Sequence, residues 1–382
     1  FRRVLFRSID RRYRFGAMVA TKGGRTDAVR VAFGAESADA WSAPTPDHHR
    51  YPRDAVFGLS PHGGTFVEIS STRDLDLLQQ MTLSGRPLLG PNGLCRWRQG
   101  DFNMTSDRGR FVDCRTAESE GWRQGADGRW RHPKMPQVLR ALWQGAMIGT
   151  LHPQLGAYHT GSGRGVRWRP ARADGKTEPQ YLVEERAATT AAPRIGLRAL
   201  SNATNERSAI ACLLADEPCG NSLGALTARP DSATPWRDCA FAAGVLASLT
   251  FDWALRLRLS GTNLNRFVLA DTVLPACDAS IEVEIARRAL RLCAILPWHA
   301  ASWRGPRDEG WTPQDWSMAT HAALDATERQ RIHAELEAWV ALAFGLDPAD
   351  FAWMLRDCAH PIETLRDRKS TRLNSSHSSV SR

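Results

Sequence analysis

The spacing of apolar residues along the chain predicts several helices, most of them in its second half. Residues 73–81 carry apolar side chains at the spacing of a short amphipathic helix. Residues 241–259 and 281–296 are longer apolar stretches that indicate buried helices, the second with arginines along its polar side. Residues 202–215 begin with polar capping candidates and continue with apolar residues, which favours a further helix.

The clearest helix signals lie near the C-terminus. Asp325 and Glu328 have the spacing of a capping box before an apolar face over residues 332–343. Gly345 stands where a C-cap glycine is expected, and Pro348 stands in the first turn of a following helix. This part of the chain is therefore expected to form a helical hairpin that packs on another element.

Strand signals are shorter. Alternation over residues 65–69 and the composition of residues 194–200 predict strands, and residues 135–148 read as a short helix or strand that turns at Gly145. Three stretches show no clear period: 9–55, 90–134 and 170–193. The first of them is expected to be irregular and the last to be a surface loop.

The two ends are expected to derive from a sequencing-library adapter. Back-translation of residues 1–8 and 367–377 gives two nucleotide sequences that share a long reverse complement. The alternative is a polar N-terminal arm and a Ser-rich disordered tail over residues 367–382. On the adapter interpretation the natural part is about residues 9–366, and it is a piece of a longer protein.

The ends also change the meaning of the net charge. The chain carries a formal charge of +9, but residues 1–8 and 367–382 contribute +3 each, which leaves +3 for residues 9–366. A body of this charge is only mildly basic, so charge alone gives little support for a nucleic-acid partner.

Motifs of catalysis and metal binding are missing from the sequence. There is no G-x-S-x-G, H-E-x-x-H or Walker motif, and residues 156–165 do not fit a phosphate-binding loop. The eight cysteines form no C-x-x-C pair, which argues against zinc and favours small buried side chains in a reducing, cytoplasmic compartment. No apolar run is long enough to span a membrane.

The fourteen tryptophans offer a different signal. Three of them, Trp97, Trp130 and Trp168, are flanked by arginine on both sides. Interleaved aromatic and guanidinium groups suit nucleic acid, through stacking and phosphate pairing. The alternative, which composition alone favours, is that tryptophan packs inside while the arginine stems lie over it.

A series of short segments occurs in an order known from one family. They are residues 57–60 through Asp74, 86–89, 101–107, 144–148 with Tyr158, Arg198, 204–207, 220–223, 261–267 and 344–346. Together they resemble the region after the catalytic domain in the large adenine-specific DNA methyltransferases of type IIG restriction–modification and BREX-like phage-defence systems. At the segment 144–148 and the residue before it, this chain has Trp143 and Ala146 where the family has tyrosine and lysine.

The resemblance implies a fold and a domain organisation. It predicts an α+β fold: a mixed target-recognition domain of short strands and several helices, followed by the C-terminal helical hairpin. The expected divisions are 1–8 adapter, 9–130 connecting region, 131–300 target-recognition domain, 310–366 helical segment and 367–382 adapter tail. The family's Rossmann-like catalytic domain, which binds S-adenosylmethionine, is expected to be mostly or wholly missing.

The catalytic signature of the family is absent from residues 1–382. That signature, Asn/Asp-Pro-Pro-Tyr/Phe, holds the amino group of a flipped adenine and stacks on its ring. The resemblance therefore implies that the parent protein transfers a methyl group from S-adenosylmethionine to adenine. The present chain is expected to hold no cofactor and to be inactive alone, with double-stranded DNA and the upstream catalytic domain as its partners.

The resemblance also implies which residues contact DNA, since a recognition domain must hold phosphates and read base edges. The candidates are Arg198, Asn205, Arg207, Asn221, Asn263, Asn265, Arg266 and Tyr158. Guanidinium groups bind phosphate or guanine, and amide side chains match adenine. For the asparagines the alternative is a role in turns and caps, and for Tyr158 it is covering the core.

Two other functions stay open at this point. The chain could be a non-enzymatic DNA-specificity module of a defence system, which acts without a fused catalytic domain. It could also be a globular module that mediates protein contacts only. The second predicts no salt-dependent DNA binding.

Overall fold

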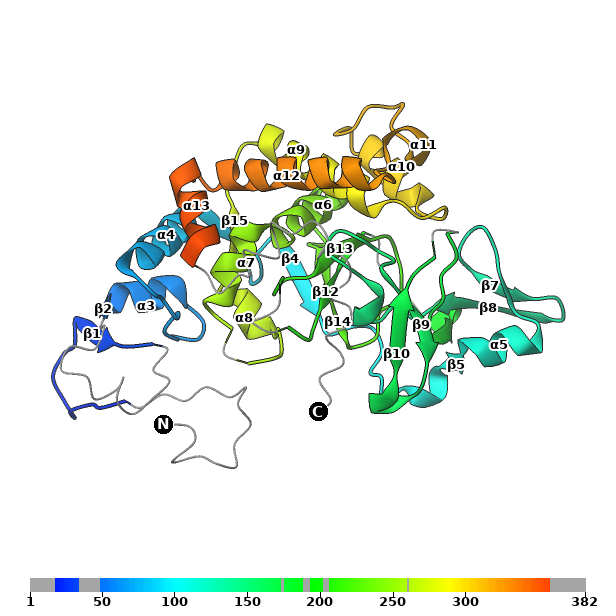
Figure 1. Cartoon of the computed structure of the whole chain (residues 1–382), viewed down its shortest axis with the longest axis horizontal. Helices are drawn as coiled ribbons and strands as arrows, with labels where there is room; N and C mark the ends of the chain where they lie inside the picture. The colour runs from blue at the N-terminus through cyan, green and yellow to red at the C-terminus, as the bar shows by residue number, and fades with distance from the viewer. Residues whose placement is uncertain are drawn as a thin grey trace.

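The computed structural model describes residues 18–33, 49–172, 175–187, 193–201, 206–259 and 261–357. Within these ranges the chain forms several small antiparallel sheets beside a layer of helices (Figure 1). The fold is therefore α+β, as expected from the sequence.

A four-stranded antiparallel sheet lies at the centre. Its order is β13 (Ala211–Leu214), β12 (Arg194–Arg198), β14 (Leu223–Ala228) and β4 (Cys95–Arg98). The predicted strand over residues 194–200 is confirmed. The predicted helix over residues 202–215 is wrong in its described part, because Ala211–Leu214 is a strand. All four of its residues are buried, and a strand buried on both faces loses the alternation that separates strands from helices.

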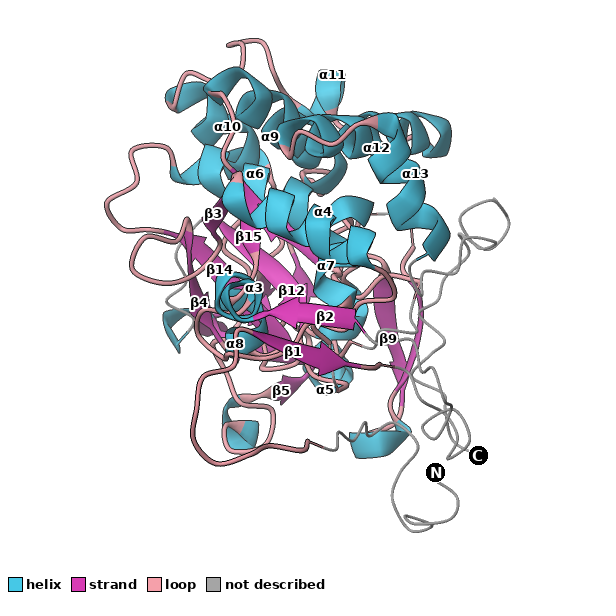
Figure 2. Ribbon diagram, turned by 90° about the vertical axis from the view of Figure 1, so that its left-hand side faces the viewer, coloured by secondary structure: helices cyan, strands magenta, loops and turns pink. Residues whose placement is uncertain are grey.

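One face of this sheet is covered by helices. They are α6 (Pro235–Leu246), α7 (Leu249–Arg256), α9 (Ala279–Cys293), α10 (Ala300–Asp308) and α12 (Ala326–Ala343). α6 contacts β12, β13 and β14 and also packs on α9, so it lies between the sheet and the outer helices (Figure 2). Its residues 238–246 are all buried. The predicted helix over residues 281–296 is confirmed as α9.

The apolar stretch 241–259 is divided into two helices. α6 and α7 bend by 65° at the break between them. Ser248 begins α7, and its Oγ accepts a hydrogen bond from the Phe251 amide at 3.1 Å. In the described part of the chain no single helix has the length and hydropathy to cross a bilayer, and only this bent pair reaches them jointly.

A second sheet lies beside the first. Its order is β5 (Val112–Asp113), β11 (Tyr181–Glu184), β8 (Met135–Ala141), β7 (Trp130–His132) and β6 (Arg123–Gln124). A short helix, α5 (Cys114–Glu120), follows β5, although the sequence shows no helical period there. The surface loop expected over residues 170–193 is wrong at β11, whose first three residues are buried.

A separate hairpin stands next to this sheet. β9 (Gly156–Thr160) and β10 (Arg167–Pro170) pair with each other as a two-stranded antiparallel ribbon. Each of the three arginine-flanked tryptophans lies on a strand, in β4, β7 and β10. Because side chains alternate along a strand, Trp97 and its two arginines in β4 face opposite sides. Trp130 is buried, as the packing alternative predicts.

The N-terminal part is more regular than its sequence suggests. It contains β1 (Ala28–Val31), β2 (His49–Pro52), α3 (Arg53–Leu59), α4 (Thr72–Leu83) and β3 (Gly85–Pro87), which pairs with β15 (Val273–Pro275). The helix predicted over residues 73–81 is confirmed as α4, with a capping box of Ser71 and Asp74. The strand predicted over residues 65–69 is wrong: the alternation of buried and exposed side chains is present, but no strand pairs there.

The C-terminal helical hairpin is confirmed. Asp325 accepts hydrogen bonds from the first amides of α12, and Gly345 ends the helix with φ +70°. The chain then enters α13 (Pro348–Asp357). Trp353 donates a hydrogen bond from Nε1 to Asp74 at 2.9 Å, and this contact fixes α13 on α4.

Packing crosses the divisions expected from the sequence. β4 belongs to the segment 9–130 but completes the sheet formed by strands of the segment 131–300. α9, from that middle segment, packs on α12 from the C-terminal segment. The central sheet and its helices therefore draw on all three segments.

The contact between α6 and α9 is close enough to test. A Cβ atom on Gly244 would lie 2.7 Å from Cγ2 of Ile285. We expect Gly244→Ala to lower the free energy of unfolding by about 1–3 kcal/mol, because overpacking displaces α9. Gly58→Ala in α3 is the matched control, since nothing lies within 4 Å of the added atom. The midpoint of urea unfolding measures the stability of both variants. A Gly244→Ala midpoint equal to that of the parent chain would contradict the close packing of α6 on α9.

Candidate nucleic-acid interface

Three separate segments meet where β12 ends: residues 198–201, 220–223 and 261–267. We call them the β12 edge. The amide of Ala199 donates to the Ser222 carbonyl at 3.0 Å, and the Leu264 amide donates to the Ala199 carbonyl at 2.8 Å. The β12 edge contains five of the eight predicted DNA-binding residues: Arg198, Asn221, Asn263, Asn265 and Arg266.

Two further segments of the family resemblance lie against the β12 edge. From residues 101–107, the Met104 amide donates to Oδ1 of Asn221 at 3.2 Å. From residues 144–148, the Gly145 amide donates to Oγ of Ser222 at 3.0 Å. Gly145 is required there, because an added Cβ would lie 2.9 Å from the Ser222 carbonyl oxygen. Segments that are more than 40 residues apart in the sequence thus pack together.

The outer part of the β12 edge is exposed to solvent. Asn263, Asn265 and Arg266 are exposed, and no carboxylate of the described residues pairs with Arg266. Asn265 stands before α8 (Arg266–Ala270) but makes no capping hydrogen bond, so its amide is available to a partner. Amides and a guanidinium group are the side chains that read base edges and hold phosphate.

Two apolar side chains stand beside these polar groups. Leu200 is 67% exposed and Phe267 is 66% exposed. Neither residue is predicted from the sequence, since a single exposed apolar residue is common in proteins. Their position within a segment of asparagine and arginine is the signal that could have identified them. Phe267 directly follows Arg266 in α8, and Leu200 forms a backbone bridge with Asn263.

Arg198 has an internal partner. Its guanidinium donates to the Ile148 carbonyl, from Nε at 3.1 Å and also from Nη2. Burial lowers the pKa of Arg198 to about 10, and within the described ranges no carboxylate pairs with it. Arg198 therefore positions the turn after β8 at Ile148. A contact of Arg198 with phosphate would have to be made in addition to this hydrogen bond.

A second arginine holds the same turn. Arg329 from α12 donates to the carbonyl of Leu151 at 3.0 Å. Leu151 has φ +49°, the left-handed region that a leucine rarely adopts. A strained residue of this kind persists only where its surroundings fix it. The two arginines hold the carbonyls on either side of the turn and thereby connect the β12 edge with α12.

Asn221 and Tyr158 also have internal partners. Oδ1 of Asn221 is occupied by the Met104 amide, which is the turn role that the sequence left open. Tyr158 lies on β9, outside the β12 edge. Its hydroxyl donates to the Gly161 carbonyl at 2.7 Å, and its ring lies edge-on to Trp168 at 6.1 Å.

Arg207 faces the helical layer. Its Nη2 lies 3.1 Å from Oε1 of Glu337 on α12, and both side chains are largely buried. Glu337 also accepts a hydrogen bond from the Leu249 amide at 2.7 Å. Through this ion pair, Arg207 holds the β12–β13 connection against the helical layer. Asn205, the remaining candidate, lies outside the described residues.

Histidines near Arg207 and Arg329 are held neutral. Burial, assisted by Arg329, Arg207 and His152, lowers the pKa of His333 to about 3. Burial and Arg329 lower the pKa of His152 to about 4. The groups between the β12 edge and α12 are therefore arranged for stability at neutral pH.

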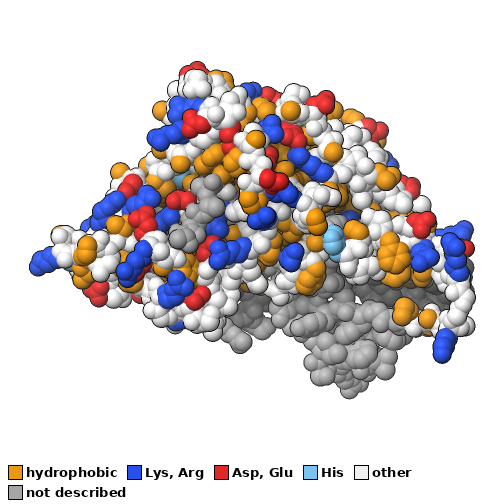
Figure 3. All heavy atoms as spheres, turned by 180° about the vertical axis from the view of Figure 1, so that it is seen from behind, with side chains coloured by type: hydrophobic (Ala, Val, Ile, Leu, Met, Phe, Trp, Pro, Cys, Tyr) orange, Lys and Arg blue, Asp and Glu red, His pale blue; other side chains and the backbone are white. Residues whose placement is uncertain are grey.

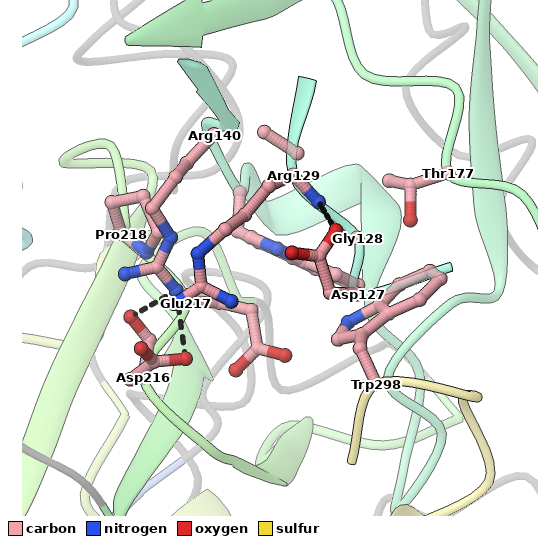
Figure 4. A pocket seen from close by; sticks show the side chains of 11 residues that line it. Asp127, Gly128, Arg129, Arg140, Thr177, Asp216, Glu217, Pro218 and Trp298 are labelled. Carbon is pink, nitrogen blue, oxygen red and sulfur yellow. Dashed lines mark hydrogen bonds and ion pairs between the residues drawn. The ribbon is translucent and has the colours of Figure 1, made fainter. Parts of the chain in front are cut away.

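A polar pocket lies away from the β12 edge, between the two sheets (Figure 4). Arg140 pairs with Asp216 at 2.7 Å and Glu217 pairs with His299 at 3.0 Å. Burial would raise the pKa of Glu217, but the hydrogen bond and the charge of His299 bring it down to about 2. The cavity volume is about 40 Å³, which suits a few water molecules. It cannot hold S-adenosylmethionine or a nucleobase, so the pocket does not fit the family's cofactor.

The described residues contain no cluster of three or more histidine, cysteine or acidic side chains arranged to hold a metal ion. The seven described cysteines are free, and all but Cys277 are buried. The chain matches no protein-family model and no curated protein sequence. The family resemblance therefore depends on the short sequence segments alone.

The Arg207–Glu337 pair leads to a stability prediction. Arg207→Ala should lower the free energy of unfolding by about 1–3 kcal/mol, because it leaves the buried Glu337 carboxylate without its partner. The double variant Arg207→Ala/Glu337→Gln should recover part of the loss, since it removes the isolated charge. Urea unfolding measures both. A single variant as stable as the parent chain would show that the pair is not structural.

The histidines lead to a pH prediction. A folded-state pKa near 3 for His333 means that protons bind the unfolded chain first, so stability is lost as pH falls from about 6.5 towards 3. His333→Gln should reduce the difference in urea midpoint between pH 7.5 and pH 4.5. His159→Gln, on the exposed end of β9, is the control. An unchanged pH dependence in His333→Gln would contradict the burial argument.

Proposed function

We propose that this chain is the DNA-recognition part of a site-specific adenine DNA methyltransferase of a restriction–modification or phage-defence system, acting in the cytoplasm. The observation that carries the proposal is the packing of segments 101–107, 144–148, 198–201, 220–223 and 261–267 against one another. These are five of the nine segments on which the family resemblance depends. A functional surface built from distant parts of a chain is expected to show this convergence.

In this proposal the β12 edge contacts duplex DNA. Arg266 would neutralise a phosphate, and Asn263 and Asn265 would read base edges, because their amides are exposed and unoccupied. Arg198, Asn221 and Arg207 would act indirectly, by holding the segments that carry the exposed groups. Methyl transfer would belong to the catalytic domain of the parent protein, which supplies S-adenosylmethionine and the flipped-base site.

One observation favours a second candidate, a module that binds another protein. Seen from behind, the described basic side chains are interspersed with acidic and hydrophobic ones and form no single large patch (Figure 3). Leu200 and Phe267 are apolar side chains of the kind that anchor protein contacts. This candidate predicts that mutation of Phe267 abolishes partner binding and that duplex DNA does not bind.

Salt-dependent DNA binding distinguishes the two. The chain should bind a mixed-sequence duplex with an affinity that falls steeply with salt. For each phosphate contact, the logarithm of the binding constant should fall by roughly 0.9 for every tenfold rise in salt concentration. Arg266→Ala should weaken binding across sequences and reduce the slope by about one contact. Arg304→Ala, an exposed arginine on α10 in the helical layer, is the control. A version limited to residues 9–366 separates this binding from the charge of the two ends.

The contradicting result is equally clear. A folded, monodisperse sample that binds no duplex at low salt would exclude autonomous DNA recognition and favour the protein-binding candidate. Equal loss of affinity in Arg266→Ala and Arg304→Ala would show binding through general charge and would exclude the β12 edge as the contact surface.

A further inference from the structure

The β9–β10 hairpin has a packed inner part and an exposed end: Trp168 packs on the main core, and the Tyr158 amide donates to the Glu178 carbonyl at 2.8 Å. Its strands form hydrogen bonds as a pair, outside both larger sheets, and lie side by side on the face away from the helical layer (Figure 1). Residues 159–163, together with Arg167 and Pro170, are exposed. An isolated two-stranded ribbon is marginally stable in water, so this hairpin depends on the contacts of its inner part.

Charge distinguishes this hairpin from the rest of the chain. Residues 156–172 contain four arginines and no aspartate or glutamate. The acidic group that contacts them is Glu178, which pairs with Arg169 and lies 3.9 Å from Arg172. Arg167 is exposed, and no carboxylate of the described residues pairs with it. The exposed end is therefore basic in a chain whose body is nearly neutral.

A further arginine joins the hairpin from outside. Arg115 on α5 lies 5.3 Å from the ring centre of Tyr158 and donates to the His159 carbonyl. Arg115 is exposed as well. A guanidinium group is thus supplied on the Tyr158 side of the ribbon by a different element.

The end of the hairpin is stiff. The Tyr158 hydroxyl closes the turn on the Gly161 carbonyl, and Trp168 pairs with Tyr158 across the strands. Gly161 has φ +90°, and an added Cβ would lie 2.1 Å from the Gly165 carbonyl oxygen. A preformed turn loses little entropy when a partner binds.

The base of the hairpin is attached to the turn at residues 144–148. The Leu155 amide donates to the Met147 carbonyl at 2.7 Å, and a Cβ on Gly156 would lie 2.2 Å from the Ala146 carbonyl oxygen. Ala146 and Met147 belong to the turn that Arg198 holds. The turn at residues 144–148 therefore connects the base of the hairpin with Ser222 at the β12 edge.

We infer that the β9–β10 hairpin enters the major groove of duplex DNA as a two-stranded ribbon. The inference rests on the proposed function. The major groove of B-DNA, about 12 Å wide, admits a two-stranded β-ribbon, whereas the deep, narrow major groove of A-form RNA excludes it. Arg167 at the exposed end contacts phosphate or guanine, and Arg115 and Arg169 flank the strands.

The test compares two duplexes that differ only in the major groove. A random-sequence library is first enriched for binding to the full 382-residue chain. The enriched duplexes are then prepared with cytosine and with glucosylated 5-hydroxymethylcytosine, whose sugar fills the major groove. The full chain should bind the glucosylated duplexes about tenfold more weakly, in the range expected for loss of base-edge contacts. An RNA duplex should compete poorly.

Variants assign the effect to the hairpin. Arg167→Ala should weaken binding to unmodified duplex several-fold and lose most of the sensitivity to glucosylation. Arg304→Ala on α10 should keep both. Circular dichroism confirms that each variant is folded, which is expected because both side chains are exposed. A second variant, Ser162→Glu at the turn, places a negative charge at the exposed end and should weaken binding further.

The outcomes separate the two proposals. If the chain binds duplex DNA but glucosylation has no effect, or Arg167→Ala and Ser162→Glu bind as the parent does, the hairpin inference is wrong and the proposed function stands. If duplex RNA competes as well as DNA, groove entry is wrong. If the folded chain binds no duplex at all, both proposals fall.

Discussion

The burial of α6 between the central sheet and α9 is the constraint on which the rest of the fold depends. Nearly every side chain from Asp238 to Leu246 is removed from water, so apolar burial fixes the sheet against the helical layer. Gly244 allows the helices to approach closely. The sheet is thereby rigid where β12 ends, and the segments that meet at that edge are carried on a fixed frame.

Arginine connects this frame with the surface. Arg194 pairs with Asp101, Arg198 and Arg329 hold the turn after β8, and Arg207 pairs with Glu337. A guanidinium group suits these positions because its several donors can satisfy carbonyls and carboxylates together. Much of the arginine content is therefore structural. Arg266 and Arg167 are exposed, and no carboxylate of the described residues pairs with them.

Sequence patterns identified the elements whose signals are local. α4, α9, α12 and α13 have apolar periodicity, capping residues or a helix-ending glycine, and β12 has a clear strand composition. β13 and β11 were missed because strands whose side chains are buried on both faces lose their alternation. For the candidate site, eight residues were predicted from the sequence, and the structure places five of them at the β12 edge. The sequence could not reveal that Arg207 is paired internally or that Leu200 and Phe267 are exposed, because both depend on long-range packing.

Amide hydrogen exchange with and without duplex DNA tests the central claim most directly. The claim is that one face, formed by the β12 edge and the β9–β10 hairpin, contacts DNA. It predicts slower exchange on DNA binding in residues 156–170, 198–201 and 261–267, with no change in α9 and α12. Slower exchange confined to α9, α10 and α12, or none in the three named segments while DNA is bound, would contradict the account.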